Sequence, residues 1–257
     1  MRKDNTIPLV TWSDVPAALG LLTRLPIRVE TEEAIARGAA SAWAYPVVGI
    51  CIALITGVFA TFFLWLSLPH TIIAAFCLVI TVFLTGAMHE DGLADCADGL
   101  WGGWTMAGRL EIMKDSHIGT YGVIALILSM MLRFLALSVV IEANKFWLAL
   151  ILTATISRTN MVVLMTFLPN AREGGLSRSV GRPSQRTMLV SCSVSVLATL
   201  LLAFWATPLI LMTAALSALA CATIAKAKVG GQTGDVLGAT QQVTEIMLFI
   251  LFATVVF

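Results

Sequence analysis

The sequence predicts an all-α, polytopic integral membrane protein with about seven transmembrane helices and polar loops on one face. Of its 257 residues, 58% are hydrophobic and only 12% are charged, and the mean hydropathy is +0.91. Soluble domains are about half apolar and a quarter charged, so this composition is typical of a membrane protein. The net charge of +1 gives no reason to expect a nucleic-acid partner.

Seven segments are long and apolar enough for transmembrane helices, which need about 20 mostly apolar residues. They are 44–68, 71–89, 121–141, 146–169, 187–206, 208–225 and 240–257. If the N-terminus is cytoplasmic, 13 of the 16 Lys and Arg residues fall on the cytoplasmic side, as the positive-inside rule requires. The turns on the opposite side are too short to carry much chemistry. We therefore expect all substantial polar loops to share the cytoplasmic face.

A cluster of acidic residues, HEDGLADCADG, follows the second apolar segment. If residues 91–98 are helical, Asp91, Asp95 and Asp98 fall within an arc of about 60°. Three carboxylates on one stripe repel one another, and a bound cation or protonation relieves the repulsion. Mg²⁺ prefers carboxylate ligands and is usually completed by waters and substrate phosphates. The spacing predicts a metal-assisted phosphate site; the alternative is a solvated acidic loop, which the glycines in this segment favour.

Two further polar segments lie on the same predicted face. In GRLEIMKDSHIGTYG, Arg109 and Lys114 are suited to hold phosphate oxygens, and Asp115 is a candidate metal ligand or general base. In AKAKVGGQTGDVLGA, Lys228 precedes a glycine-rich turn with Asp235, where successive backbone N–H groups can form an anion site. The alternatives are basic side chains that only reach the membrane interface, and a plain helix connector.

Arg133 and Arg158 lie near the middle of predicted spans. A buried Arg costs at least about 2.5 kcal/mol on insertion scales and must face a partner or a cavity. One alternative is a structural ion pair of one arginine with Glu142 or Glu245. The other is a cavity in which both arginines face a pyrophosphate.

The segments HEDGLADCADG, RLEIMKDSHIGTYG and GGQTGDVLGA resemble the cobalamin 5'-phosphate synthase family, the adenosylcobinamide-GDP ribazoletransferases. LLTRLPI, YPVVGI and AREGGL are similar to other segments of that family, in the same order over nearly the whole chain. The resemblance implies an Mg²⁺-dependent transferase of the bacterial cytoplasmic (inner) membrane. Such enzymes join α-ribazole or its 5'-phosphate to adenosylcobinamide-GDP and release GMP, which is the last nucleotide-loop assembly step of cobalamin biosynthesis.

The resemblance and the residues together define an expected site. Asp91, Asp95 and Asp98 would hold Mg²⁺, and Asp115 or His117 would accept the proton of the attacking ribose hydroxyl. The expected substrate contacts are polar side chains of the cytoplasmic face and the spans: His89, Arg109, Lys114, Arg158, Arg172, Lys228 and Asp235.

The expected organisation is one membrane-embedded transferase domain over residues 1–257. It contains an N-terminal interfacial segment at 1–40 and an acidic catalytic loop at 89–120. The lipid bilayer and the two substrates are the expected partners, and the oligomeric state stays open, with a homo-oligomer as one option.

Two other classes of protein stay open at this stage. CDP-alcohol phosphotransferases and membrane prenyltransferases also place spaced aspartates at a membrane edge to hold Mg²⁺ and a diphosphate. The spacing D-x₃-D-x₂-D does not separate these chemistries. An ion-coupled transporter is the third alternative, but transporters need polar groups near the midplane and access from both faces. Here the acidic residues crowd one face.

Overall fold

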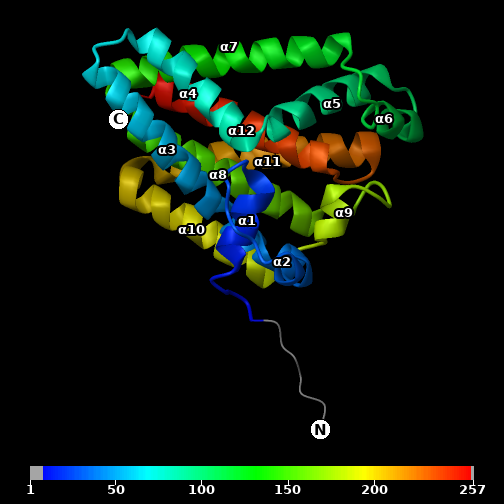
Figure 1. Cartoon of the computed structure of the whole chain (residues 1–257). Helices are drawn as coiled ribbons and strands as arrows, with labels where there is room; N and C mark the ends of the chain where they lie inside the picture. The colour runs from blue at the N-terminus through cyan, green and yellow to red at the C-terminus, as the bar shows by residue number, and fades with distance from the viewer. Residues whose placement is uncertain (1–7, 256–257) are drawn as a thin grey trace.

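The computed structural model describes residues 8–255, which form a bundle of long helices edged by shorter ones (Figure 1). Within these residues there is no β-strand, and one isolated bridge pairs Asn170 with Gln232. The helices are α1 (Asp14–Leu22), α2 (Thr31–Arg37), η1 (Gly38–Ala44), α3 (Tyr45–Trp65), α4 (His70–Thr85), α5 (Met88–Gly102), α6 (Met106–Ile112), α7 (Thr120–Glu142), α8 (Phe146–Phe167), α9 (Leu176–Val180), α10 (Gln185–Ala203), η2 (Phe204–Ala206), α11 (Thr207–Val229) and α12 (Gly234–Thr254). The predicted all-α fold is confirmed.

Five helical stretches of the described chain are long and apolar enough to cross a membrane: Thr31–Trp65, Thr120–Glu142, Phe146–Phe167, Gln185–Val229 and Gly234–Thr254. The pair α4 and α5 makes a sixth if the two are counted as one bent span. The predicted number of about seven was therefore approximate. One cause is that α4 has only 16 residues. The other is that predicted spans 187–206 and 208–225 are joined through η2 into one helical stretch, in which α10 and α11 contact each other.

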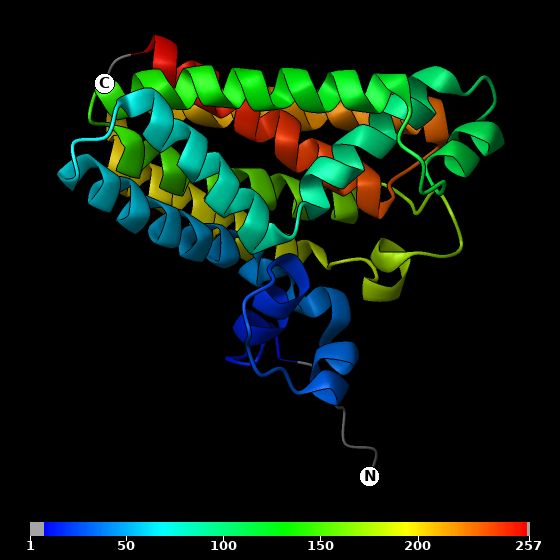
Figure 2. The same cartoon turned by 45° about the horizontal axis from the view of Figure 1, so that its top comes forward.

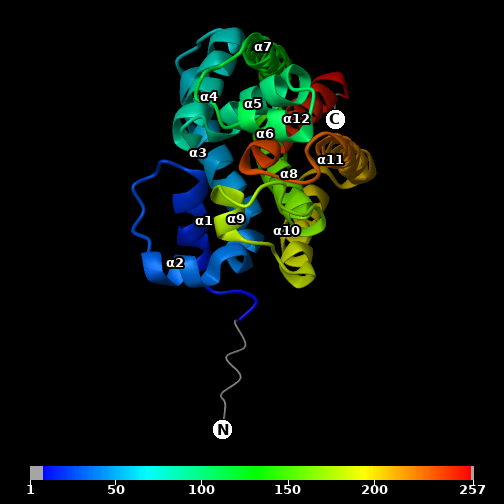
Figure 3. The ribbon, with the colours of Figure 1, turned by 90° about the vertical axis from the view of Figure 1, so that its right-hand side faces the viewer.

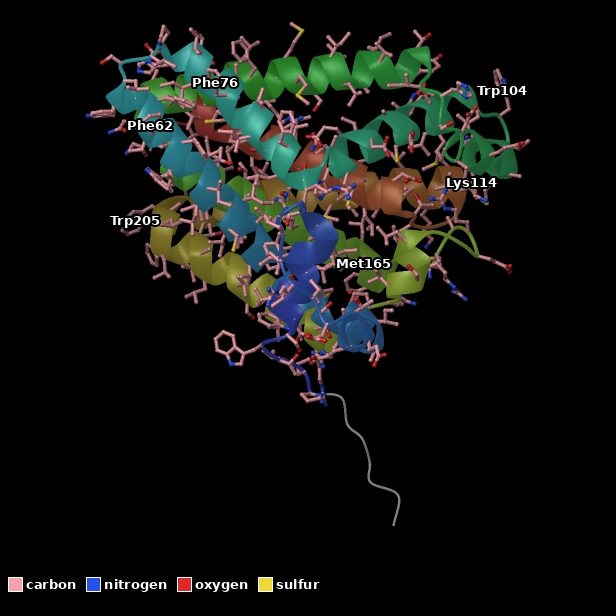
Figure 4. All side chains as sticks on the ribbon, viewed as in Figure 1. Phe62, Phe76, Trp104, Lys114, Met165 and Trp205 are labelled. Atoms are coloured by element: carbon pink, nitrogen blue, oxygen red, sulfur yellow. The ribbon has the colours of Figure 1, made fainter. Side chains whose placement is uncertain are left out.

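The two ends of the bundle carry different connections. Phe62 and Trp205 lie at one end, and Trp104 and Lys114 lie at the other (Figure 4). Trp205 is 92% exposed and Trp104 is 95% exposed. Tryptophan gathers at membrane–water interfaces because its ring is amphipathic, so these side chains mark the two interfaces. We call the Trp104 end the polar end, because it carries the long connections 86–119 and 168–184, together with the short connection 230–233.

Helix α8 is the centre of the bundle. Most of its residues are buried, and it contacts α3, α10, α11 and α12. Figure 3, viewed from the polar end, shows these helices around it. The contact between α3 and α8 is close because Gly49 has no side chain: a Cβ at that position would overlap the backbone carbonyl of Ala154. The central helix is therefore held by backbone-to-backbone packing.

A sharp bend separates α4 from α5. Gly86 and Ala87 both have positive φ, at 63° and 59°, and the two helices make an angle of 89°. Positive φ is strained for alanine but is common for glycine at a helix C-terminus. The predicted span 71–89 is therefore wrong at its end, because α4 stops at Thr85. The segment 89–120, expected as a loop, is largely helical, since it contains α5 and α6.

A small N-terminal unit, made of α1, α2 and η1, lies beside the start of α3 (Figure 2). Its centre is an ion pair between Arg37 Nη2 and the fully buried Asp14 Oδ2, 2.6 Å apart. The indole Nε1 of Trp43 donates a second hydrogen bond to the same oxygen at 2.6 Å. Of the predicted interfacial segment 1–40, residues 1–7 lie outside the described residues, whereas exposed Trp12 and Ile35 give the unit an apolar outer surface.

The contact at Gly49 makes a direct prediction for stability. Gly49→Ala forces α3 away from α8, and overpacking of this kind costs about 1–3 kcal/mol. Thermal unfolding of the purified protein in detergent micelles measures the loss. Gly102→Ala is the matched control, because its added Cβ would meet only Ile112 Cδ1 at 3.8 Å. Equal melting temperatures for the two variants would contradict this account of the packing.

Candidate active site

The candidate site is built where α5 crosses the first turns of α12. Two glycines allow the close approach. A Cβ at Gly92 would lie 2.8 Å from the carbonyl oxygen of Asp235, and a Cβ at Gly238 would lie 3.3 Å from the backbone of His89. The crossing brings Asp235, at the start of α12, beside the aspartates of α5, although they are far apart in the sequence.

The crossing gathers carboxylates around Asp95. This half-buried side chain interacts unfavourably with Asp91, Asp235 and Asp98, and favourably with Arg172. Arg172 itself forms an ion pair with Asp235, with 3.1 Å between Nη2 and Oδ2. The cluster therefore contains more carboxylates than cationic side chains. We call Asp91, Asp95, Asp98 and Asp235 the carboxylate cluster.

Asp98 differs from the other members because it also binds the start of α7. Its Oδ2 accepts a hydrogen bond from the N–H of Gly119 at 2.7 Å, and its Oδ1 accepts one from the N–H of Gly122 at 2.9 Å. A carboxylate is favourable at a helix N-terminus, where backbone N–H groups are unpaired and the helix dipole is positive. Asp98 therefore fixes the chain that returns from α6 to α7.

The N-terminus of α12 lies in the same site. Thr233 is its N-cap and accepts a hydrogen bond from the N–H of Val236 at 3.2 Å. The preceding residue, Gln232, pairs with the 168–184 connection, since its N–H donates to the carbonyl of Pro169 and its carbonyl accepts from the N–H of Ala171. This pairing places Arg172 beside α12, and its buried Nη1 has no hydrogen-bond partner among the described residues. A helix N-terminus next to an unpaired guanidinium nitrogen is suited to bind a phosphate group.

A second charged group lies inside the bundle, on the inner side of α5. Arg133 of α7 is completely buried, and its Nη1 lies 3.2 Å from Glu90 Oε1 and 3.3 Å from Glu245 Oε1. Gln242 donates to the same Glu90 oxygen at 3.1 Å, and Gln241 donates to Glu245 at 2.6 Å. The network therefore ties α5, α7 and α12 together. Of the two alternatives left open by the sequence, the structural ion pair with Glu245 is the one that Arg133 adopts.

Arg158 and His89, both expected to contact substrate, lie in this inner region. Arg158 is 1% exposed and donates from Nη1 to the carbonyl of Ala154 at 3.0 Å. Its Nε and Nη2, and the Nε2 of His89, have no hydrogen-bond partner among the described residues. Arg158 interacts with Glu245 and Glu90. The structure therefore places both side chains with the charges inside the bundle rather than at the carboxylate cluster.

The cationic residues of the polar end have different surroundings. Arg109 donates from Nε to the carbonyl of Gly103 at 3.0 Å and from Nη1 to the carbonyl of Lys228 at 3.1 Å, so it joins α6 to the end of α11. The Nζ of Lys228 lies 5.6 Å from the centre of the Trp101 ring. Lys114 is exposed at the tip of the polar end (Figure 4).

Asp115 and His117 form an exposed pair in the connection between α6 and α7. Asp115 Oδ1 lies 2.7 Å from His117 Nδ1. This side-chain hydrogen bond lowers the pKa of Asp115 and raises the pKa of His117. Among the described residues, neither side chain is hydrogen-bonded to the carboxylate cluster. The connection that carries them is held at Gly119 by Asp98.

The residues of the carboxylate cluster suit a divalent cation by their chemistry. No three His, Cys, Asp or Glu side chains among the described residues lie close enough together to enclose a metal ion as they stand. The cluster nevertheless offers carboxylate oxygens, the ligands that Mg²⁺ prefers, and it lies beside a helix N-terminus of the kind that is suited to bind phosphate. A cation with few protein ligands and its remaining positions filled by water and substrate phosphate fits this arrangement.

Fold and site together define a multi-pass membrane protein with an acidic, phosphate-suited site at one end of its bundle. The chain belongs to the cobalamin-5-phosphate synthase family, whose model matches residues 14–253. The resemblance predicted from the sequence, and with it the assignment as an enzyme of cobalamin synthesis, is confirmed.

Similar proteins cover nearly the whole chain. A relative from Bradyrhizobium diazoefficiens is 39% identical over 242 residues, which are 94% of this chain and 93% of the relative. Relatives from Azorhizobium caulinodans and Mesorhizobium japonicum are 39% and 38% identical, over 91% and 95% of this chain and 92% and 94% of their own. All three are named adenosylcobinamide-GDP ribazoletransferase. No solved structure shows a significant match.

The inner network makes a prediction for stability. Arg133→Met leaves Glu90 and Glu245 buried without their cation, and removing one partner of a buried ion pair costs about 3–5 kcal/mol. Thermal unfolding in detergent measures the loss, and Glu90→Gln in the same chain should restore part of it. Lys145→Met, which removes an exposed cation at the opposite turn, is the control and should melt like the wild type. A wild-type melting temperature for Arg133→Met would contradict the network's role.

Proposed function

We propose that this protein joins α-ribazole or α-ribazole 5'-phosphate to adenosylcobinamide-GDP, giving adenosylcobalamin or its 5'-phosphate and GMP. Membership of the family and the names of the relatives support this assignment. The observation that carries the proposal is the carboxylate cluster beside the N-terminus of α12 and Arg172. The arrangement supports the proposal because transfer from a diphosphate needs groups that can hold a cation and groups that can bind phosphate at one site.

Mg²⁺ is the cation that we propose for the carboxylate cluster. Asp91 and Asp95 would be its main ligands, with Asp235 close to them. Asp98 would contribute through the oxygen lone pairs that its two hydrogen bonds to the start of α7 do not use. A carboxylate oxygen has two lone pairs, so a hydrogen bond does not exclude coordination. When bound, the cation would neutralise charge on the diphosphate oxygens.

The chain's own groups bind and orient the substrates in this proposal. Arg172 and the free N–H groups at the start of α12 hold non-bridging oxygens of the diphosphate. A ribose hydroxyl oxygen forms a bond to the cobinamide-linked phosphorus, the bond from that phosphorus to the bridging oxygen breaks, and GMP leaves. The hydroxyl proton goes to Asp115 or His117, which share a hydrogen bond in the connection next to Asp98. Positioning and charge stabilisation supply most of the rate enhancement.

We also propose that the polar end faces the cytoplasm and that the membrane is the bacterial inner membrane. The excess of Lys and Arg in the connections of this end supports the orientation, as does the shortness of the opposite turns. Both substrates would then reach the site from the compartment that contains nucleotides.

The role of the carboxylates is tested by charge removal that keeps side-chain shape. Asp95→Asn and Asp91→Asn should each lower turnover at least about 100-fold, because charge on the transferring phosphoryl group is no longer offset. Their melting temperatures should stay at or above the wild-type value, since a repulsive charge is removed. Glu111→Gln, an exposed carboxylate of α6, is the control and should be fully active. Wild-type activity of the purified Asp95→Asn protein would exclude the proposed site.

The reaction itself is tested with purified protein, adenosylcobinamide-GDP and α-ribazole. We expect one GMP and one completed corrinoid per turnover, followed by mass spectrometry and absorbance, and we expect EDTA to stop the reaction and Mg²⁺ to restore it. Release of CMP or inorganic pyrophosphate from a lipid donor, without GMP formation, would instead assign a lipid phosphotransferase or prenyltransferase. Activity that is unaffected by EDTA would reject the role of Mg²⁺ while leaving the transfer reaction in place.

A further inference from the structure

A groove between α8, α10 and α11 is separate from the candidate active site. It has a volume of about 440 Å³, and its walls are mainly apolar, with Val163 and Phe167 from α8, Val196 from α10, and Leu211 and Leu219 from α11. Figure 3 shows α10 on the side of α8 that is opposite to α5 and α7, and α11 beside α12. Both α10 and α11 belong to a stretch that is apolar enough to cross the membrane. The groove therefore lies at the depth of the lipid chains.

The polar groups at the floor of this groove already bind one another. Thr159 and Ser195 share a hydrogen bond of 2.6 Å between their hydroxyls. The amide of Asn160 donates to the carbonyl of Ala214 and to the hydroxyl of Thr244, each at 2.9 Å. The hydroxyl groups of Thr159 and Ser195 and the amide N–H groups of Asn160 therefore already have partners, so the groove offers an occupant a mainly apolar surface.

The length of the groove matches one leaflet of a bilayer. Its lining extends along α11 from Leu211 to Ala222, which is about 16 Å at the rise of an α-helix. This is about half of the roughly 30 Å thickness of the hydrocarbon core. An acyl chain of one leaflet, lying parallel to the helices, has this length and is wholly apolar.

The groove ends at a basic pocket on the polar end. Its lining at this end includes Phe167, the last residue of α8, and Leu168 directly after it, and the next residue, Pro169, lines a pocket of about 370 Å³. Arg178 and Arg182 line this second pocket, and its described lining contains no carboxylate. The Nε of Arg182 donates to the carbonyl of Thr166 at 2.7 Å, which holds the guanidinium at the end of α8. The positive charge of the two arginines therefore lies next to the end of the apolar groove, on the polar end of the bundle.

We propose that this groove and its basic pocket form a binding site for one anionic phospholipid. One acyl chain lies along α8, α10 and α11, and the phosphate group lies between Arg178 and Arg182. The continuity of an apolar groove with a basic pocket carries the inference, because a free phosphate would use only the pocket and an uncharged lipid only the groove. Charge attraction of this kind contributes about 1 kcal/mol per arginine near the surface.

Native mass spectrometry of the purified full chain tests the site. Delipidated protein is titrated with phosphatidylglycerol or with phosphatidylcholine, and the expected result is one tightly retained phosphatidylglycerol per chain. The double variant Arg178→Gln, Arg182→Gln should weaken phosphatidylglycerol retention at least about tenfold and leave phosphatidylcholine retention unchanged. Ala222→Trp, which fills the groove, should weaken retention of both lipids. Glycerol 3-phosphate should not displace the lipid, since it lacks the chain.

Matched controls separate this site from general lipid association. Arg186→Gln removes a nearby exposed arginine that does not line the pocket, and Leu216→Trp introduces the same tryptophan side chain on an exposed face of α11 outside the groove. Both should retain phosphatidylglycerol like the wild type. Equal retention by the double arginine variant and the wild type would overturn the proposal, as would displacement of the lipid by glycerol 3-phosphate. The arginine variants change exposed side chains, so they test the site even if Ala222→Trp does not fold.

Discussion

The structure depends on the pairing of charges that are buried inside an apolar bundle. Moving an ion out of water costs several kcal/mol even after relaxation, and this cost is recovered only by close, hydrogen-bonded partners. Arg133 has two such partners, Glu90 on α5 and Glu245 on α12. Because Glu90 is followed directly by Asp91, the contact that neutralises Arg133 also fixes the start of the acidic stripe. The inner charges and the outer carboxylates are therefore parts of one arrangement.

The bend between α4 and α5 decides which carboxylates face outward. At Gly86 and Ala87 the chain leaves the direction of α4, and α5 then crosses α12 at Gly92 and Gly238. One side of α5 faces the buried arginines, whereas another side carries Asp95 and contributes to the carboxylate cluster around it. The inner side is close to neutral because each glutamate has a cation nearby. The outer side keeps an excess of negative charge, so it is the side on which a cation gains most by binding.

Much of this could be predicted from the sequence because it depends on local patterns. The apolar segments identify a membrane protein. Asp91, Asp95 and Asp98, which share one stripe if residues 91–98 are helical, do lie on a helix, α5. The contacts that the sequence did not reveal join residues far apart in the chain. Glu90 and Arg133 are 43 residues apart in the sequence. Patterns within single helices give no information on which residues of different helices form ion pairs. Gly92 and Gly238 permit the close crossing of α5 and α12, but the sequence did not indicate which helix each of them contacts.

Some predicted site residues have structural contacts that only the fold explains. Arg109 was expected to hold phosphate, yet its guanidinium binds the carbonyls of Gly103 and Lys228. Asp98 was expected to bind metal, and it also caps α7. In both cases the residue type was suited to two roles, since a guanidinium binds any oxygen acceptor and a carboxylate binds any N–H donor. The tertiary structure decides which partner lies within hydrogen-bonding distance of each side chain. The sequence alone does not give these distances.

The connection 168–184 links the candidate active site to the membrane. Arg172 near its start faces the carboxylate cluster, whereas Arg178 and Arg182 near its end line the basic pocket. The connection has little regular structure and is held through Gln232 at one end and the carbonyl of Thr166 at the other. The position of Arg172 therefore depends on two anchors, one at Gln232 just before α12 and one at Thr166 on α8.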